Sequence, residues 1–203
     1  MLTAEQRRQF HQADSDLDAL TVERLLDLLT VLTVTDARDF TAGVMDTLPA
    51  LVAELGEVSA LIGSTMYETA RDQSDARGRF TVNLSDPPNT EQVQATARWA
   101  LAPLFSPENV LGPAELTGLL TARLSAGAPR LVREGGRRTI VDNTARDPAR
   151  PRYRRVLSAG KKTHCDFCTM LAGRGFVYHT KDTAGAGKHF HDRCGCGLEL
   201  GFN

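Results

Sequence analysis

The chain has 203 residues, of which 41% are hydrophobic and 24% are charged. These proportions are ordinary for a globular protein and exclude wholesale disorder, a collagen-like fibre and a miniprotein held together by disulfides. Apolar runs are only a few residues long, and the first ten residues lack the apolar core of a secretory signal. We therefore expect neither a membrane span nor export.

The net charge of −1 hides three zones of different charge. Residues 1–129 carry 9 basic and 18 acidic side chains, residues 130–164 carry 11 and 3, and the last 39 residues carry 4 of each. Such zoning is typical of segments that meet different partners. Together with the Pro148 and Pro151 breaks, it predicts an acidic helical region (1–129), a basic connector (130–151) and a C-terminal module (152–203).

The first 75 residues predict helices, because leucine and valine recur at helical spacing. One stripe consists of Leu17, Leu20, Leu25, Leu28, Leu29 and Leu32. The other consists of Val44, Leu48, Leu51, Leu55, Val58 and Ile62. Pro49 interrupts the second stripe, so we expect a helix to begin or kink there. Core packing in a helical bundle explains both stripes better than a dedicated oligomerisation seam.

The middle of the chain predicts a short extended segment followed by further helices. Residues 79–84 alternate in polarity and form either a strand or an extended linker. Asn89 or Thr90 then caps a helix, and two apolar stripes follow. Their members are Val93, Ala97, Leu101 and Leu104, then Leu116, Leu119, Leu120 and Leu124. Residues 129–147 are also helical in pattern, although the pair Gly135-Gly136 weakens this prediction.

After Pro151 the pattern changes to short strands and turns. Residues 152–156, 175–179 and 197–202 read as strands, and residues 184–187 read as a flexible loop. A module of this size with few large apolar side chains needs a cross-link, or staple, to be stable, and a bound metal ion is the usual one. The fold class expected is mainly α, with a helical N-terminal region followed by a small zinc-stapled α+β C-terminal module.

The metal ligands are predicted from the cysteine spacing. All four cysteines lie in the last 39 residues, as Cys165-x-x-Cys168, a 22-residue spacer, and His191-x-x-Cys194-x-Cys196. Two cysteine and histidine pairs brought together make a tetrahedral zinc site. Cys165, Cys168 and His191 are the firmest candidates, and either Cys194 or Cys196 is the fourth. His189 is a spare for His191. One alternative is a set of reduced buried thiols or an adventitious disulfide. Another is a catalytic zinc, but cysteine-rich sites with four protein ligands are normally closed.

The basic segment before these cysteines is rich in arginine, whose planar fork suits phosphate oxygens. It predicts salt-sensitive, sequence-independent binding of nucleic acid. The alternative is that these side chains pair with the acidic region 1–129 or with an acidic partner. The candidates are Arg130, Arg133, Arg137, Arg138, Arg146, Arg150, Arg152, Arg154, Arg155, Lys161 and Lys162.

The C-terminal residues resemble a known phage family. The resemblance covers roughly residues 152–203 and is to the C-terminal domain of Mu F-like minor head proteins, in the form found in tailed phages of actinobacteria. Its motifs are the run 165–175 (CDFCTMLAGRG), Val177-Tyr178, Ala184-Gly185 and the run 191–196 (HDRCGC). Many relatives have His-Pro where this chain has His191-Asp192. Carried over as ligands are Cys165, Cys168, His191, Cys194 and Cys196.

The resemblance implies a non-enzymatic minor capsid protein with a structural zinc ion (Zn2+). Such a protein assembles in the host cytoplasm and resides in the virion, inside the head. It is present in several copies, associates with the portal or major capsid protein, and contacts packaged double-stranded DNA during packaging or ejection. No membrane is implied. Two alternatives remain, a zinc-dependent nuclease or other nucleic-acid-processing enzyme, and a bacterial zinc-ribbon DNA-binding protein.

Overall fold

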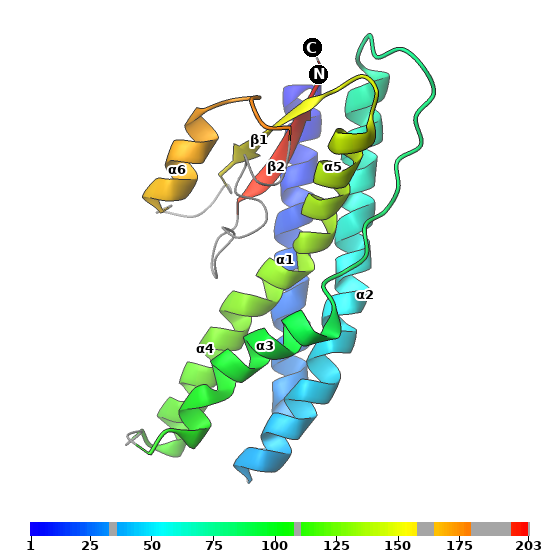
Figure 1. The fold of residues 1–203 in the computed structure, drawn as a ribbon. Coiled ribbons are helices and arrows are strands. Elements are labelled where there is room, and N and C mark those ends of the chain that lie inside the picture. The colour runs from blue at the N-terminus through cyan, green and yellow to red at the C-terminus, as the bar shows by residue number, and fades with distance from the viewer. Residues whose placement is uncertain (33–35, 108–110, 158–164, 180–195, 203) are drawn as a thin grey trace.

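The computed structural model describes residues 1–32, 36–107, 111–157, 165–179 and 196–202. Long helices run roughly side by side, and a small sheet lies at the end of the molecule where both termini are found (Figure 1). This confirms the mainly helical class, whereas the zinc staple stays a prediction. The elements are α1 (Ala4–Val31), α2 (Ala37–Asp72), α3 (Thr90–Leu101), the 3-10 helix η1 (Ala102–Phe105), α4 (Pro113–Val132), α5 (Glu134–Arg146), β1 (Arg152–Val156), α6 (Asp166–Gly173) and β2 (Gly197–Gly201).

The first two helices begin at polar caps, which satisfy backbone N–H groups that the first turn leaves without a partner. The Thr3 hydroxyl accepts from the Gln6 N–H at 3.2 Å, and the Gln6 side chain accepts from the Thr3 N–H at 2.9 Å. Asp36 Oδ1 accepts from the N–H groups of Arg38 and Asp39 at the start of α2. The prediction of helices in the first 75 residues is therefore confirmed.

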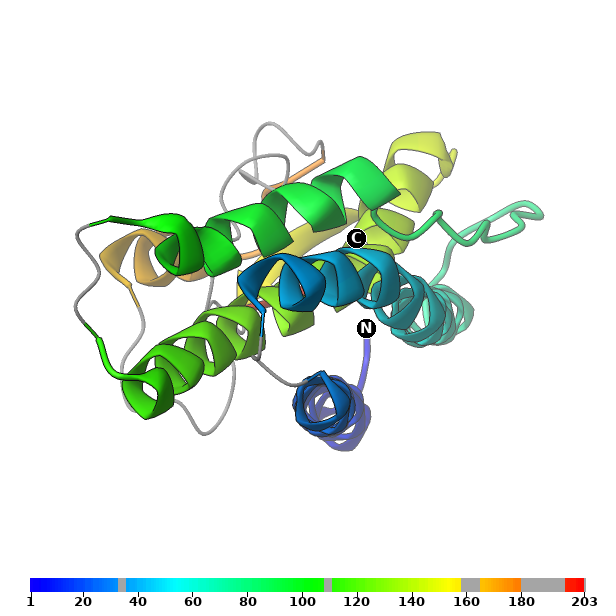
Figure 2. The ribbon, with the colours of Figure 1, turned by 90° about the horizontal axis from the view of Figure 1, so that it is seen from below.

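The predicted apolar stripes are buried in part. In α2, Val44, Leu48 and Leu55 are buried, but Val58 is 41% exposed. In α1, Leu17 and Leu25 are buried, whereas Leu20 is 40% exposed. The buried face of each helix therefore contains fewer residues than the predicted stripe. Seen from below, α2 lies between α1 and α3 (Figure 2), and it also contacts α4, α5 and β2.

Pro49 lies inside α2, so the expectation that a helix begins there is wrong. Proline has no N–H to donate to the carbonyl four residues earlier, which belongs to Met45. The Gln94 side chain of α3 donates to that carbonyl at 3.4 Å. A neighbouring helix thus supplies the hydrogen bond that the proline removes, and α2 continues through it.

The segment between α2 and α3 is extended and forms no strand, so the linker alternative holds for residues 79–84. Two α5 side chains bind its backbone. Asn143 Oδ1 accepts from the Asn83 N–H at 3.0 Å, and Thr139 Oγ1 accepts from the Ser85 N–H at 3.1 Å. Asn89 then caps α3 through the Gln92 N–H, as predicted.

The helix predicted over residues 129–147 is present, but it is divided between the end of α4 and α5 at Arg133. Its two glycines lie where α5 packs on α2. A Cβ at Gly136 would lie 2.6 Å from the Ser59 carbonyl oxygen, and one at Gly63 would lie 2.6 Å from the Gly136 oxygen. The glycines that weaken the helical pattern therefore permit the closest approach of two helices.

The sheet consists of β1 and β2 paired antiparallel, with Arg152 opposite Gly201 and Val156 opposite Gly197. These strands match two of the three predicted. The third, over residues 175–179, is reduced to one bridge between Tyr153 and Tyr178. The helix α6 was not predicted from the sequence, and the loop expected at 184–187 lies outside the described residues.

Buried side chains form two large clusters. The aliphatic core lies among α1 to α4, and its members are Leu17, Leu25, Phe40, Val44, Leu48, Val52, Leu55, Val93, Ala97, Ala100, Leu101, Leu120, Leu124, Ala128, Leu131 and Val132. The aromatic core lies at the end with the termini, and its members are Leu2, Met66, Tyr67, Ala70, Ile140, Val141, Tyr153, Leu171, Tyr178, Leu198, Leu200 and Phe202. The proposed boundary near residue 150 stays a prediction, although the described residues beyond it share the aromatic core with α2 and α5.

By length and composition alone, α2 is apolar enough to cross a membrane. This differs from the expectation drawn from short apolar runs. However, half of its most apolar window is buried inside the protein, and core helices commonly pass the same test.

Candidate functional site

Three of the five predicted zinc ligands lie together. Cys168 and Cys196 are buried against each other, and Cys165 and Leu157 pack on them. The cluster lies between α6, β1 and the start of β2, which the sheet pairing brings together (Figure 1). The Cys-x-x-Cys pair and a cysteine 28 positions further along the chain therefore lie in one cluster.

The first of these cysteines caps α6. Cys165 Sγ accepts from the Cys168 backbone N–H at 3.3 Å. A helix N-terminus favours negative charge on an acceptor at this place. The sulfur of Cys165 is therefore in an environment that suits a thiolate, which is the form that binds a metal ion.

The cluster alone is not a complete metal site. Within the described residues, no group of three or more His, Cys, Asp or Glu side chains is placed to hold a metal ion. His191 and Cys194, as well as the spare His189, lie outside the described residues. A donor set of thiols and imidazole is one that zinc prefers, and Cys165, Cys168 and Cys196 lie together, while His191 stays a predicted nitrogen ligand. The zinc ion itself stays a proposal.

The arginines of residues 130–155 divide into inward and outward groups. Arg133, Arg137 and Arg155 are only 6%, 6% and 1% exposed. Arg133 Nε donates to Asp18 at 2.6 Å, and its Nη2 donates to the Asp14 carbonyl at 3.2 Å. These buried guanidinium groups are not presented to a ligand on the surface. For them the structure favours the alternative of internal pairing over contact with nucleic acid.

Two further arginines of the predicted set are held at the surface by protein partners. Arg154 donates to Glu199 Oε2 at 2.8 and 2.6 Å, and Arg130 donates to the Thr96 hydroxyl at 3.2 Å. Glu199 is itself buried and also lies 3.6 Å from Arg7. Lys161 and Lys162 lie outside the described residues.

The outward group lies on α5, in the turn after it and at the first residue of β1. Arg138, Arg146 and Arg150 are exposed, and Arg152 is half-buried. Arg150 has a φ of 49°, a left-handed conformation that is uncommon for arginine, and its N–H donates to the Asp147 carbonyl at 2.9 Å. Among the described members of the predicted nucleic-acid set, Arg138, Arg146 and Arg150 are the exposed ones, and half-buried Arg152 lies next to them in the chain.

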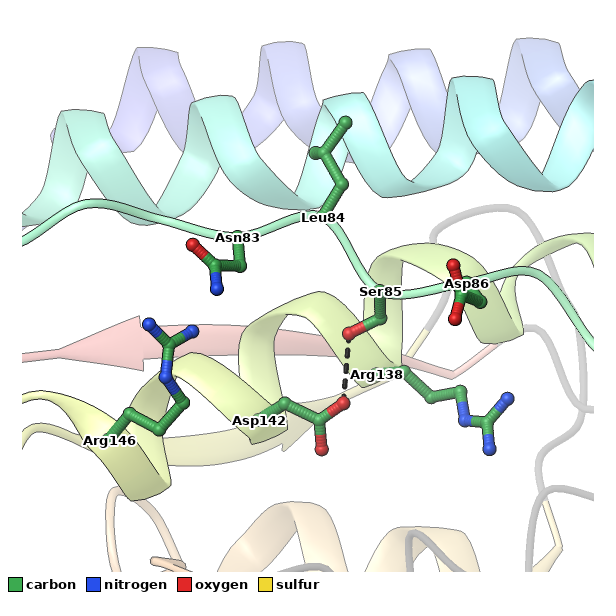
Figure 3. Close-up of a pocket in the computed structure, with 7 residues that line it drawn as sticks. All are labelled: Asn83, Leu84, Ser85, Asp86, Arg138, Asp142 and Arg146. Carbon is green, nitrogen blue, oxygen red and sulfur yellow. Dashed lines mark hydrogen bonds between the residues drawn. The ribbon is translucent and has the colours of Figure 1, made fainter.

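A pocket of about 310 Å³ lies between α5 and the extended linker (Figure 3). Its lining residues are Asn83, Leu84, Ser85, Asp86, Arg138, Asp142 and Arg146. The Ser85 hydroxyl donates to Asp142 at 2.8 Å across the pocket. Two guanidinium groups and two carboxylates face it, so its lining has no net charge. The pocket offers hydrogen bonds of both kinds but no excess of positive charge for an anion.

The buried carboxylate of Asp147 and the half-buried carboxylate of Asp14 lie in the polar interior, and neither was predicted from the sequence. Asp147 accepts from the Tyr67 hydroxyl at 3.1 Å and from Arg71 Nε at 2.9 Å. Burial, reinforced by Asp147, raises the pKa of Tyr67. Burial also raises the pKa of Asp14, against the opposing effect of Arg133 and Arg137. No local pattern identifies these residues, because their partners are distant in sequence.

Comparison with known proteins gives a match to one protein-family model. The model, described as VG15 protein, matches residues 1–202. It is a viral protein family, which agrees with the phage resemblance at that level. No curated protein and no solved structure matches the chain.

Proposed function

The chain belongs to the VG15 protein family, a viral family, and from this premise we propose that it is a non-enzymatic minor capsid protein of a tailed phage. The match over residues 1–202 is the observation that carries the proposal. The motif resemblance of residues 152–203 to Mu F-like minor head proteins supplies the finer assignment. In this proposal the protein resides inside the head, near the portal, in several copies.

The proposed role of zinc is structural. Cys165, Cys168, Cys196 and His191 would hold the ion, which supplies a cross-link between α6 and the start of β2. The chain's own residues prepare this place, because the α6 N-terminus orients Cys165 and the β1–β2 pairing brings up Cys196. A closed site of four protein ligands leaves no position for a reacting water, which is why we propose no catalysis there.

The proposed contact with packaged DNA is restricted to the outward arginines. Arg138, Arg146, Arg150 and Arg152 would meet phosphate oxygens without reading sequence. The buried Arg133, Arg137 and Arg155 are left out of this surface. The affinity would therefore be weak, insensitive to sequence and strongly reduced by salt.

The proposed portal or capsid contact uses the acidic outer face of α2. Glu57, Val58 and Leu61 are exposed there. Glu54 lies beside them but pairs with Arg24 of α1 at 2.7 Å. Glu57 is therefore the better position for a charge reversal, since its replacement leaves the α1–α2 ion pair in place. Charge at such a surface determines partner choice more than affinity.

The assignment to the virion is tested by locating the protein in purified phage particles. Labelled antibody on intact and opened heads should detect it only after opening, near the portal vertex. A chain that is abundant in infected cells but missing from particles would refute the virion assignment. Glu57→Lys should fold normally and enter fewer particles, whereas Glu23→Lys on α1 should enter at the wild-type level.

The DNA contact is tested by measuring affinity for duplex DNA against salt concentration. Replacing Arg138, Arg146, Arg150 and Arg152 together with Ala should flatten the salt dependence. Incubation with plasmid in the presence of zinc tests the nuclease alternative in the same preparation, since cleavage with turnover would contradict a non-enzymatic role. A wild-type chain without affinity for DNA at low salt would assign these arginines to a protein partner.

A further inference from the structure

Two buried arginines contact the cysteine cluster from two different elements. Arg155 comes from β1, and its exposed fraction is 1%. Arg137 comes from α5, and its exposed fraction is 6%. Burying a guanidinium group costs desolvation free energy unless an opposite charge or strong hydrogen-bond acceptors compensate it. What these two groups contact therefore indicates where negative charge lies in the interior.

Arg155 is directed at a cysteine sulfur. Its Nη1 donates to Cys168 Sγ at 3.7 Å, and Cys168 is fully buried. Sulfur is a weak acceptor as a neutral thiol, whereas hydrogen bonds to an ionised acceptor are much stronger. The contact thus places a buried guanidinium group directly against the sulfur of Cys168.

Arg137 fixes the other side of the cluster through the backbone. Its Nη2 donates to the Cys196 carbonyl oxygen at 2.7 Å, within the buried interior. The preceding Gly135 and Gly136 are the points where α5 lies against the α2 backbone, at Gly56 and Ser59. Arg137 therefore connects the start of β2 to the closely packed pair of helices α2 and α5.

From these contacts we propose that Arg155 and Arg137 are positioning residues of the cysteine site, with Arg155 as its internal counter-charge and Cys196 as its third thiolate. The proposal rests on the structural zinc ion of the proposed function. A zinc ion with three thiolates and one imidazole carries one net negative charge, which one guanidinium neutralises. Because Cys196 shares the cluster with Cys165 and Cys168, it fits the third sulfur position.

The first test measures zinc affinity of the full-length protein by competition with a chelator. Arg155→Met removes the charge while keeping a chain of similar length, and Arg155→Lys restores it. Loss of such an outer partner typically weakens metal binding by about 10- to 100-fold. We expect that loss for Arg155→Met, partial recovery for Arg155→Lys, and wild-type affinity for Arg152→Met on the same strand. Equal affinity of Arg155→Met and Arg152→Met would overturn the counter-charge role.

The test of Arg137 uses the neighbouring Arg138 as its control. Arg137→Met should weaken zinc binding, whereas Arg138→Met, whose side chain is exposed on the same helix, should not. Cys196→Ser should reduce the zinc content, while Cys194→Ser should leave it at one ion per chain. A reversed result for the two cysteines would overturn the assignment of Cys196.

A metal-free measurement separates this inference from the zinc proposal. Urea unfolding under reducing conditions with chelator compares the wild type with Arg155→Met, Cys168→Ser and the double variant. If the two side chains interact, the second change should shift the urea midpoint much less than it does alone. A wild type that binds no zinc would refute the zinc proposal, while this coupling still decides whether Arg155 positions Cys168. Additive midpoint shifts would refute the positioning role.

Discussion

The two large cores of this protein are built from different chemistry. The aliphatic core consists of leucine, valine, alanine and phenylalanine side chains from α1 to α4. The aromatic core contains three tyrosines, and Tyr67 packs edge-on against Phe202 with 5.9 Å between ring centroids. Buried ions surround the second core, including Asp147 with Arg71 and Glu199 with Arg154. Apolar contacts stabilise the aliphatic core, whereas the aromatic core is stabilised by apolar contacts together with ion pairs.

The difference predicts different responses to substitution. An apolar core loses stability with the volume removed, because the cavity that is left collapses only in part. A buried ion network loses stability when one partner is removed, because the other charge stays buried without compensation. The predictions that follow compare these responses, beginning with the largest.

Asp147→Ala should be the most damaging of these changes. It leaves the Tyr67 hydroxyl and the Arg71 guanidinium without their shared acceptor. Removal of one partner of a buried pair costs about 3–5 kcal/mol. Urea unfolding monitored by circular dichroism measures the loss, with Asp142→Ala on the exposed side of α5 as the control. A loss equal to that of the control would show that the aromatic core does not depend on this carboxylate.

Leu48→Ala tests the aliphatic core in the same assay. Leu48 is 1% exposed, and truncation of a buried leucine costs about 2–5 kcal/mol. Leu61→Ala on the same helix should cost no more than about 0.5 kcal/mol, because that side chain is 53% exposed. Similar losses for the two variants would contradict the inward face assigned to α2.

Gly136→Ala tests the contact between the two helices that join the cores. Its Cβ would lie 2.6 Å from the Ser59 carbonyl oxygen, so α5 must move away from α2. Overpacking of this kind costs about 1–3 kcal/mol. Gly118→Ala in α4 is the matched control, because no atom lies within 4 Å of its added Cβ. That variant should gain up to about 1 kcal/mol from helix propensity. A gain in both variants would refute the close approach.

Asp14→Asn should give the smallest effect and one that depends on pH. Burial raises the pKa of Asp14, so the folded state binds its proton more tightly than the unfolded chain. The resulting stability is present below the ordinary pKa and is lost as pH rises through the folded value. Asparagine resembles the protonated group. We therefore expect a higher melting temperature at pH 7 and little change at pH 3.

Asp18→Asn provides the contrast for that experiment. Asp18 accepts from the buried Arg133 Nε at 2.6 Å, so neutralising it should lower the melting temperature at pH 7. Opposite shifts for the two neighbouring carboxylates would support the electrostatic interpretation. Shifts of the same sign would contradict it.

The aliphatic core was largely predictable, and the aromatic core was not. Helical spacing identified Val44, Leu48 and Leu55 because period and burial coincide over a long helix. The pattern failed at Val58, where α2 has no neighbour to cover the side chain fully. The eight residues of α6 are too few for a periodic pattern, and Cys165 is an unusual cap.

The sequence also did not indicate which arginine side chains are buried and which face solvent. A run of arginines indicates positive charge but not which guanidinium groups turn inward. Arg133 turns inward because Asp18, 115 residues earlier in the chain, lies opposite it. The strand itself was predicted, but its sequence does not alternate in polarity, and the structure places Tyr153 and Arg155 on the buried side. The burial of Arg155 could not be predicted, because it depends on the contact with the cysteine cluster, which only the structure shows.

The contacts between the start of the chain and β2 predict an order in which the two cores form during synthesis. Leu2 belongs to the aromatic core, and Arg7 lies 3.6 Å from Glu199. All residues of the aliphatic core have been synthesised once Val132 is added. The aromatic core is complete only after Phe202 has been synthesised. At about 5–20 residues per second, the interval is about 4–14 s. During that time α1 and α2 expose the surface that the last strand will cover, which is a period when a chaperone has access to the nascent protein.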